Sequence, residues 1–262
     1  MTNTPTKRAG RAGRSRGEDI LRLLREQMTA SVTDMAARFD VSEMTIRRDI
    51  ERLVATGQVI RVPGGARLAH SVAFEKTFAE RLQKMGDAKS RIGRAAAGLV
   101  KEGEAIVLDS GTTTLCIARN LRTHRNLVVI TFSVAALEEL RGGDSIRVEL
   151  TGGQYRRSSH DLVGAGVSEG LTKVRANKVF FGAAALSFER GVMAFDAEWP
   201  RTLLGAGAER ILVLDSSKIG DEALYVLCPL KEVDLVITDS GVKPAVLARL
   251  KQQVRVLVAD SF

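Results

Sequence analysis

The sequence predicts two domains: a small N-terminal winged helix-turn-helix and a larger, doubly wound α/β domain. Three observations predict this fold class. Short amphipathic helices follow one another within residues 18–55, and a tight turn separates the last two. Two extended runs around a Gly-rich turn come next. From residue 104 onward, apolar β-rich runs alternate with helical patterns, which is typical of a mainly parallel sheet covered by helices.

The composition excludes several classes of protein. Apolar residues make up 45% of the 262 residues and charged residues 27%, so disorder cannot dominate. No apolar run reaches the ~18 residues of a membrane-spanning helix, and no secretory signal follows the basic N-terminus. The two cysteines, Cys116 and Cys228, are too few for a disulfide framework or a zinc cluster. We therefore expect a cytoplasmic protein with no membrane contact, no metal site and no cofactor.

The positive charge is concentrated at the N-terminus. The formal net charge is +8, and residues 1–17 carry five basic side chains and no acidic one. Residues 18–70 hold equal numbers of acidic and basic side chains. We predict a disordered basic tail over residues 1–17. Two roles stay open for it: a solubilising tail, or an arm along DNA phosphates in which Arg14 and Arg16 are candidate contacts.

The first part of the chain carries the helix-turn-helix pattern. An amphipathic helix is predicted over residues 18–27, and a second helix begins near Ser31 or Thr33, either of which can cap it. Ser42 is expected to cap a third helix over residues 43–55. These short helices share an apolar face, as a helix-turn-helix requires.

The third predicted helix has the properties of a recognition helix. Its polar and basic side chains lie away from the apolar stripe, where a major groove would meet them. Arginine can bind guanine through two hydrogen bonds, and threonine can meet a thymine methyl group or a phosphate. Asp49 and Glu51 are expected to hold neighbouring arginines. A small helical bundle with solvated arginines is the alternative. The candidate DNA contacts here are Thr33, Ser42, Met44, Thr45, Arg47, Arg48 and Arg52.

A hairpin is predicted directly after this helix. Two extended runs, over residues 58–62 and 66–69, flank the turn formed by Pro63, Gly64 and Gly65. A hairpin in this place is the wing of a winged helix-turn-helix, which we place over residues 18–72. Arg61 and Arg67 are candidate contacts from the wing to the DNA backbone or minor groove.

The second domain is expected over residues 91–262, after a connecting helix over residues 73–90. In a parallel sheet, ligands bind at the carboxyl ends of the strands. The predicted strands cover residues 105–108, 127–130, 179–181, 211–214, 235–237 and 254–258. The predicted helices lie near residues 114–121, 133–140, 162–172, 199–208 and 244–251.

Polar side chains follow several of these strands. Residues 109–113 (Asp-Ser-Gly-Thr-Thr) precede a helix, so their hydroxyls and the N–H groups of the helix start form a cradle for an anion. The cradle lacks Walker A and dinucleotide spacing, which favours a single phosphate ester, with an ordinary helix cap as the alternative. Lys218 offers a charge for phosphate. The candidate effector residues are Asp109, Ser110, Gly111, Thr112, Thr113, Thr131, Ser133, Gly152, Asp215, Lys218 and Asp239.

Both domains carry motifs of a known family. The run Ser-x-x-Thr-Ile-Arg-Arg-Asp at residues 42–49 resembles the DNA-binding domain of DeoR-type bacterial transcription regulators, although Pro63 stands where that family usually has His. The second domain resembles the effector-binding domain of the same family, which is related in fold to ribose-5-phosphate isomerase. The matching runs are residues 109–113, 151–153, 163–164, 215–218 and 234–239, and the whole resemblance covers residues 17–260.

The resemblance implies a DNA-binding transcriptional regulator, most often a repressor, of a carbohydrate-utilisation operon. It implies double-stranded operator DNA, a homodimer or homotetramer, and a phosphorylated sugar or related metabolite as the effector. Glu198 is the candidate equivalent of an acidic effector-binding residue of the family, within an altered run over residues 196–200. A sugar-phosphate isomerase with Asp109 or Glu198 as its base is the alternative. We expect no enzyme, because an isomerase needs no winged domain.

Overall fold

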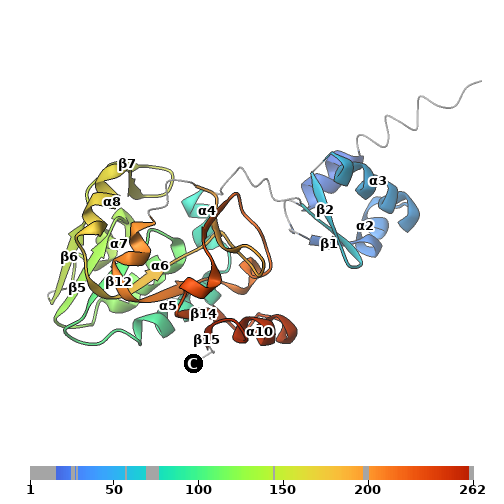
Figure 1. Cartoon of the computed structure of the whole chain (residues 1–262). Coiled ribbons are helices and arrows are strands. Elements are labelled where there is room, and N and C mark those ends of the chain that lie inside the picture. The colour runs from blue at the N-terminus through green and yellow to red at the C-terminus, as the bar shows by residue number, and fades with distance from the viewer. Residues whose placement is uncertain are drawn as a thin grey trace, which may run out of the picture. The chain divides into compact units, whose positions relative to one another are not determined.

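The computed structural model describes residues 16–24, 27, 29–56, 58–68, 77–143, 145–196 and 201–259. The chain divides into two compact units, Met1–Phe74 and Glu75–Phe262, here called unit 1 and unit 2 (Figure 1). Within the described residues, no helix is long and apolar enough to cross a membrane.

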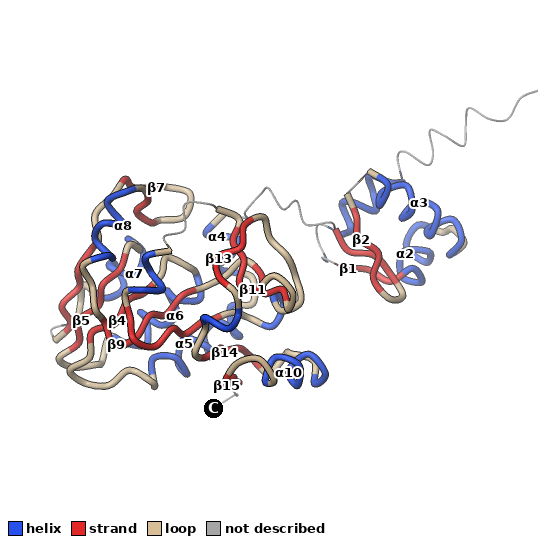
Figure 2. Tube along the Cα trace, viewed as in Figure 1, coloured by secondary structure: helices blue, strands red, loops and turns tan. Residues whose placement is uncertain are grey.

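Unit 1 is a winged helix-turn-helix, as the sequence predicts. A helix over residues 16–24 precedes α2 (Val32–Phe39) and α3 (Glu43–Ala55). The wing is the hairpin of β2 (Val59–Val62) and β3 (Gly65–Leu68). A third strand that the sequence analysis did not predict, β1 (Thr29–Ser31), pairs antiparallel with β3. The order β1-β3-β2 makes a small sheet beside the helices (Figure 2).

Local signals fix the two helices of the motif. Ser31 caps α2 by accepting a hydrogen bond from the backbone N–H of Asp34 at 2.9 Å. Asp40 ends α2 in the left-handed conformation, with φ of 51°, and so starts the turn. Ser42 caps α3 by accepting from the N–H of Thr45 at 3.3 Å. The core of unit 1 includes Ile20, Leu24, Met35, Ile46 and Ile50.

Unit 2 is built on a seven-stranded parallel sheet with the order β15-β14-β12-β9-β4-β5-β6. Successive strands run outward from β4 in one direction and from β9 in the other. The point at which the strand order reverses therefore lies between β4 and β9, as in a doubly wound sheet. The strands are β4 (Ala105–Leu108), β5 (Leu127–Thr131), β6 (Ile146–Leu150), β9 (Ala176–Phe181), β12 (Gly207–Val213), β14 (Leu235–Asp239) and β15 (Arg255–Ala259).

Helices cover both faces of this sheet, because alternate strand residues point to opposite sides. Ile106 and Leu108 of β4 pack in one core with α5 (Gly86–Ala97), α6 (Thr112–Leu121) and α7 (Val134–Leu140). Val107 packs in the other core with α8 (Ala165–Thr172), α9 (Thr202–Gly205) and α10 (Pro244–Lys251). Phe180 and Phe181, adjacent in β9, divide between the two cores in the same way.

Two smaller β structures accompany the sheet, and the sequence analysis predicted neither. The hairpin of β7 (Gln154–Arg156) and β8 (Asp161–Val163) follows β6. A separate antiparallel sheet has the order β10-β11-β13. Its strands are β10 (Ala185–Ser187), β11 (Gly191–Ala194) and β13 (Tyr225–Cys228).

Three predicted helices differ from the structure. The helix expected near residues 162–172 begins only at Ala165, because β8 runs to Val163. The helix expected near residues 199–208 is shorter, since α9 spans Thr202–Gly205 and β12 already begins at Gly207. Gly207 lies so close to β9 that an added Cβ would be 2.5 Å from a side-chain carbon of Val179, which fits a strand position. In place of one connecting helix there are two, α4 (Phe78–Gln83) and α5, separated by Met85 in the left-handed conformation.

Candidate DNA-binding and effector sites

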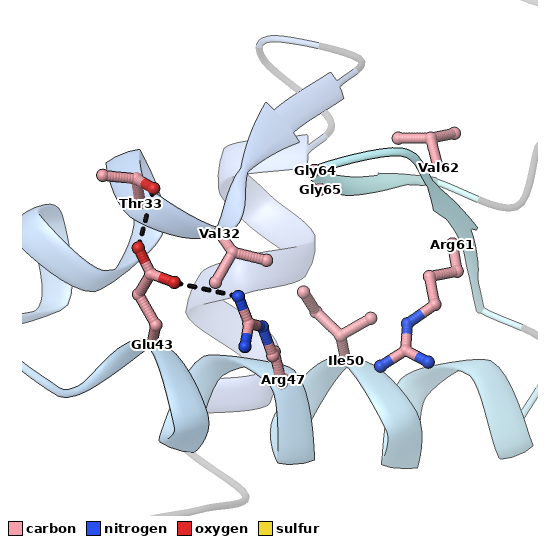
Figure 3. A pocket seen from close by; sticks show the side chains of 9 residues that line it. All are labelled: Val32, Thr33, Glu43, Arg47, Ile50, Arg61, Val62, Gly64 and Gly65. Carbon is pink, nitrogen blue, oxygen red and sulfur yellow. Dashed lines mark hydrogen bonds and ion pairs between the residues drawn. The ribbon is translucent and has the colours of Figure 1, made fainter.

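In unit 1, a polar cavity of about 350 Å³ lies between the helix-turn-helix and the wing (Figure 3). It brings together the N-terminal ends of α2 and α3, the middle of α3, and the turn of the β2–β3 hairpin. Thr33, Arg47 and Arg61 are among the predicted DNA contacts that line it. The complete lining is Val32, Thr33, Glu43, Arg47, Ile50, Arg61, Val62, Gly64 and Gly65.

Glu43 organises one side of this cavity. Its Oε1 accepts a hydrogen bond from Oγ1 of Thr33 at 2.8 Å, and its Oε2 accepts one from Nη2 of Arg47 at 3.0 Å (Figure 3). The Arg47 side chain remains 50% exposed. The sequence analysis gave Glu43 no role, although its four-residue spacing from Arg47 on a helix is the signal for such a pair.

Asp49 and Glu51 hold arginines, as the sequence analysis predicts. Asp49 is only 2% exposed; its two oxygens accept from Nε of Arg16 at 2.6 Å and from Nη1 of Arg52 at 3.3 Å. Glu51 accepts from Nη2 of Arg61 at 3.1 Å. Two of the predicted DNA contacts, Arg52 and Arg61, are thus held by carboxylates.

Arg16 belongs to the fold of unit 1. The sequence analysis places it in a disordered tail, but it lies in the helix over residues 16–24 and binds the buried Asp49. Its Nε is committed to that carboxylate, which is 33 residues away and could not be identified from local pattern. Arg14 lies outside the described residues.

The remaining predicted DNA contacts lie on α3, at its N-cap or on the wing. Met44 is 57% exposed, which is unusual for a large apolar side chain, and Arg48 is also exposed. Ser42 uses its hydroxyl to cap α3 and contacts the Thr45 hydroxyl at 2.9 Å. Arg67 lies on β3.

In unit 2, Asp109 joins the ends of β4 and β9 at the point where the strand order reverses. Its Oδ2 accepts from the N–H of Gly182 at 2.8 Å, and its Oδ1 accepts from the N–H of Ser110 at 2.7 Å. The side chain is 5% exposed. Asp109 therefore fixes the loop that leads into α6.

The start of α6 has the features of an anion cradle. Gly111 is the N-cap, and no side chain caps the helix there. Thr112 and Thr113 are 3% and 2% exposed, and within the described part of the chain their hydroxyls make no hydrogen bond. Thr114, in contrast, donates to the carbonyls of Asp109 and Gly111 at 2.7 and 2.8 Å. The first-turn N–H groups and the unpaired hydroxyls of these two threonines are therefore left for a ligand.

Thr131 and Ser133 occupy structural positions at the end of β5. Thr131 is fully buried; its hydroxyl donates to the carbonyl of Leu108 at 2.7 Å and accepts from the N–H of Ser133 at 3.0 Å. The Ser133 hydroxyl caps α7 by accepting from the N–H of Ala136 at 3.1 Å. The Thr131 hydroxyl is thus used as donor and acceptor within the fold, and the Ser133 oxygen is used as a helix cap. Gly152 is exposed after β6, with φ of 89°.

The loop after β12 holds the predicted charged residues. Asp215 accepts from the N–H of Ser217 at 3.2 Å, and Asp239 accepts from the N–H and hydroxyl of Ser216 at 2.6 and 2.9 Å. Nζ of Lys218 donates to the carbonyl of Ala183, directly after β9, at 2.5 Å. Lys218 thus lies across the strand ends from β12 toward β9. Glu198 lies outside the described residues.

Lys89 of α5 is a buried cation that the sequence analysis did not assign to the site. It is 2% exposed, and its Nζ donates to the carbonyls of Arg81 and, at 2.6 Å, Lys84. Burial lowers the pKa of Lys89 to about 8, against the attraction of Asp215, while Lys218 lowers it further. The sequence signal for this buried cation is a lysine at one of the apolar positions of an amphipathic helix.

Arg156 of the β7–β8 hairpin also escaped the sequence analysis. Its Nε and Nη2 donate to the two oxygens of Asp161 at 3.0 and 2.9 Å, and its Nη1 donates to Asp196. Burial lowers the pKa of Arg156, but the two carboxylates outweigh this and raise it above its usual value. Asp161 is 2% exposed and also accepts from the hydroxyl of Ser110 in the cradle at 2.9 Å.

The two thiols lie in the interior of unit 2. Both cysteines are buried, and burial raises the pKa of the Cys116 thiol and raises that of Cys228 to about 11. Within the described ranges, no three His, Cys, Asp or Glu side chains are grouped so that they could hold a metal ion.

A recognition helix with a wing, joined in one chain to an α/β unit with an anion cradle, defines a DNA-binding transcriptional regulator with a sensor domain. Two family models match the chain: a DeoR-like helix-turn-helix domain over residues 16–72 and a DeoR C-terminal sensor domain over residues 84–240. The chain belongs to the DeoR family of transcriptional regulators, which confirms the resemblance found in the sequence.

Curated relatives match nearly the whole chain. The HTH-type transcriptional regulator YgbI of Escherichia coli (strain K12), which is itself uncharacterized, is 33% identical over 94% of this chain and 98% of that protein. A putative aga operon transcriptional repressor of Escherichia coli O157:H7 is 31% identical, over 90% of each chain. The lactose phosphotransferase system repressor of Lactococcus lactis subsp. lactis is 31% identical, over 93% of this chain and 97% of that protein.

Among solved structures, ribose 5-phosphate isomerase A from Methanocaldococcus jannaschii matches 52% of this chain and 55% of its own, with 17% identity and a TM-score of 0.38. This likeness is too remote to bear on activity. The relatives that cover both units are regulators, and the chain is a regulator rather than an enzyme.

Proposed function

We propose that this regulator represses a carbohydrate-utilisation operon and that a phosphorylated sugar bound in unit 2 relieves the repression. The observation that carries the proposal is the start of α6, at the point where the strand order reverses. Its first turn has no side-chain cap, and the hydroxyls of Thr112 and Thr113 there are unpaired. The aga operon and lactose phosphotransferase repressors, which cover both units, support a carbohydrate effector.

The proposed effector site has a phosphate end and a sugar end. Gly111, the first turn of α6 and the hydroxyls of Thr112 and Thr113 offer donors to a phosphate, and Lys218 adds a positive charge. Ser110 lies at the edge of this site, where its N–H and hydroxyl donate to Asp109 and Asp161. Asp215, Asp239, Gly152 and Glu198 are the candidates near the sugar, where carboxylates and backbone groups can bind hydroxyls. Asp109 holds the loop in place between the two strand ends.

The proposed operator interface is the face of unit 1 that carries the cavity between α3 and the wing. Met44, Thr45, Arg47 and Arg48 lie in the first half of α3, the part that enters a major groove in this motif. Thr33, Ser42, Arg52, Arg61 and Arg67 surround it, and Arg14 would reach DNA from the N-terminal segment. A homodimer or homotetramer would match the two half-sites of an operator.

The effector would act only through a difference in its affinity for the DNA-bound and the free regulator. Fluorescence anisotropy with the chain's own promoter region should therefore show binding that weakens with salt and weakens again when the right sugar phosphate is added. If the protein binds the promoter and no member of a sugar-phosphate panel changes that binding, the proposed effector class is wrong. If the protein shows no salt-dependent binding to the promoter, the proposed operator binding is wrong.

A thermal-shift screen identifies the effector independently, because a ligand of the folded state raises its apparent stability. Lys218→Ala should remove the shift produced by a phosphorylated ligand. Lys243→Ala is the matched control, since Lys243 is an exposed lysine at the start of α10. An undiminished shift in Lys218→Ala would remove Lys218 from the site.

A further inference from the structure

The β7–β8 hairpin is attached to the strand ends and to the anion cradle through β8. Asp161 of β8 forms a bridge with Ser133 at the start of α7, and the N–H of Leu162 donates to the carbonyl of Phe132 at 2.8 Å. The Asp161 carboxylate then accepts from the hydroxyl of Ser110 at 2.9 Å. The hairpin is therefore fixed beside the carboxyl ends of β4 and β5.

Arg156 is held next to the cradle by this attachment. Oδ2 of Asp161 lies 2.9 Å from Oγ of Ser110 and also 2.9 Å from Nη2 of Arg156. A single oxygen atom thus bridges a cradle hydroxyl and the guanidinium. A phosphate that accepts from Gly111 and the first turn of α6, directly after Ser110, would lie beside this guanidinium.

The two carboxylates on Arg156 are not equivalent. Asp161 is 2% exposed and takes two parallel hydrogen bonds, which fixes the plane of the guanidinium. Asp196 has a side chain that is 31% exposed, and Arg156 reaches it through Nη1 alone. A partly exposed single-bonded pair contributes little compared with a buried bidentate pair, so Asp196 is the partner that an anion can displace.

The charges around the cradle also require a cation here. Asp109 and Asp161 are buried at its edge, and their negative charges oppose a phosphate dianion. Lys218 lies toward β9, where it binds the carbonyl of Ala183. Among the residues that the structure describes, Arg156 is the cation on the Ser110 side of the cradle.

We infer that Arg156 is a phosphate-binding residue of the effector site and that the phosphate takes the place of Asp196 on its Nη1 group. The ligand class is a phosphorylated polyhydroxyl compound, so the inference rests on the phosphorylated effector proposed above. Asp161 positions the guanidinium, and Asp196 competes with the ligand for it.

The test is isothermal titration of the full chain with inorganic phosphate and with ribose 5-phosphate, using ribose as the unphosphorylated reference. Arg156→Lys keeps a positive charge beside the buried Asp161 but loses the two-bonded geometry; it should weaken phosphate binding about tenfold. Asp196→Asn removes the competing charge and should tighten binding by a few-fold. Arg157→Ala, at the exposed neighbouring position, should change nothing.

The opposite directions of Arg156→Lys and Asp196→Asn separate binding from a structural role, because a structural pair would weaken binding in both variants or in neither. Unchanged affinity in Arg156→Lys, or weaker binding in Asp196→Asn, would overturn the inference while leaving a phosphorylated effector in place. A wild-type chain that binds its promoter but neither phosphate probe would overturn the inference together with the phosphate end of the proposed site. Melting curves of each variant confirm that it is folded.

Discussion

Glu43 holds Arg47 on the cavity side of α3, with 3.0 Å between Oε2 and Nη2, and the same carboxylate accepts from the Thr33 hydroxyl of α2. The pair spans four residues of one helix, the spacing at which side chains are neighbours. Arg47, whose side chain is half exposed, is thus oriented by a carboxylate that would itself lie close to DNA. Two effects of Glu43 can be measured: the orientation of Arg47 and the repulsion between the carboxylate and DNA phosphates.

Arg47→Ala should weaken operator binding by ~1–3 kcal/mol if Arg47 reads a base, and the loss should be larger for the operator than for unrelated duplexes. Glu43→Gln removes the negative charge, so it should tighten binding to unrelated duplexes and lower the ratio of specific to non-specific affinity. Anisotropy titrations with operator and scrambled duplexes at two salt concentrations measure both.

Arg22→Ala is the matched control for these two variants, because Arg22 is an exposed arginine of the first helix paired with Asp19. It should leave the ratio of specific to non-specific affinity unchanged. Equal losses on all duplexes for Arg47→Ala would assign Arg47 to a phosphate. A Glu43→Gln variant that lost affinity for every duplex would show that orientation of Arg47 outweighs repulsion.

The ion pair of Arg16 with Asp49 separates the stability of unit 1 from the role of the basic segment before it. Arg16→Ala leaves Asp49, 2% exposed, with the longer hydrogen bond to Arg52, so unit 1 should lose about 1–3 kcal/mol of unfolding free energy. Thermal denaturation of the variant, followed by circular dichroism, measures the loss. An unchanged melting curve would mean that Arg52 alone satisfies the carboxylate.

Removal of residues 1–15 keeps Arg16 and takes away four basic residues, Lys7, Arg8, Arg11 and Arg14. If this segment lies along DNA phosphates, operator affinity should fall and its dependence on salt should become less steep. If it is a solubilising tail, neither should change, and only the solubility of the chain should fall. A truncation that also removed Arg16 would mix this effect with the loss of the Asp49 pair.

Local signals in the sequence predicted the elements that local interactions make. The cap at Ser42 and the helix over residues 43–55 depend on neighbours within a few positions, and both are present in the structure. The alternation of strands and helices predicted the parallel sheet. Ser110 and Lys218 belong to the cradle edge because strand ends of a parallel sheet meet at one edge, whatever their separation in sequence.

Pairings between distant residues were not predictable in the same way. Strand β1 forms because it pairs with the distant strand β3, with Thr29 opposite Arg67. The proposed role of Arg156 depends on Asp161, which accepts a hydrogen bond from Ser110, 51 residues away in the sequence. Thr131 and Ser133 were predicted as ligand groups from their place after a strand, but their hydroxyls are used within the fold. A sequence shows which residues end a strand and does not show which of their hydrogen bonds are already satisfied.

Close packing of α5 on α6 places Lys89 and the cradle relative to each other, and Gly93 permits it. A Cβ at Gly93 would lie 2.5 Å from the backbone carbon of Cys116, which cannot move without shifting α6. Gly93→Ala should therefore cost ~1–3 kcal/mol of the stability of unit 2 and weaken ligand binding at the start of α6. Urea unfolding and the phosphate titration measure the two effects.

Gly98→Ala is the matched control for this variant. Gly98 follows α5 in a right-handed helical conformation, and an added Cβ would meet its nearest neighbours at 3.5 Å or more. The substitution should be neutral or slightly stabilising, because alanine restricts the unfolded chain more than glycine does. Equal stability of both variants would show that α6 can adjust to the extra methyl group.

Lys89 should give unit 2 a stability that rises with pH. Its pKa in the folded chain is about 8, lowered from 10.5 mainly by burial, so between these values the unfolded chain binds the proton that the folded chain has lost. Stability increases with pH wherever the unfolded state binds more protons. The contribution of Lys89 is thus fully present above its unfolded pKa and is lost as the pH falls through the folded value.

The buried thiols contribute a stability that falls as the pH rises. The pKa of Cys228 is raised to about 11, so its contribution is lost as the pH rises through that value, and the pKa of Cys116 is raised as well. The difference between wild type and Lys89→Met therefore isolates the lysine. Urea unfolding followed by circular dichroism should show a wild-type midpoint that climbs relative to the variant from about pH 8 to pH 10.

Lys243→Met, at an exposed position on the same unit, should follow the wild-type pH dependence. Phosphate adds a further expectation, because an anion near Lys218 also attracts the ammonium of Lys89 and favours its charged form. Saturating phosphate should therefore move the rise in wild-type stability to higher pH. Parallel pH curves for wild type and Lys89→Met would mean that the ammonium stays charged in the fold, held by the carbonyls of Arg81 and Lys84.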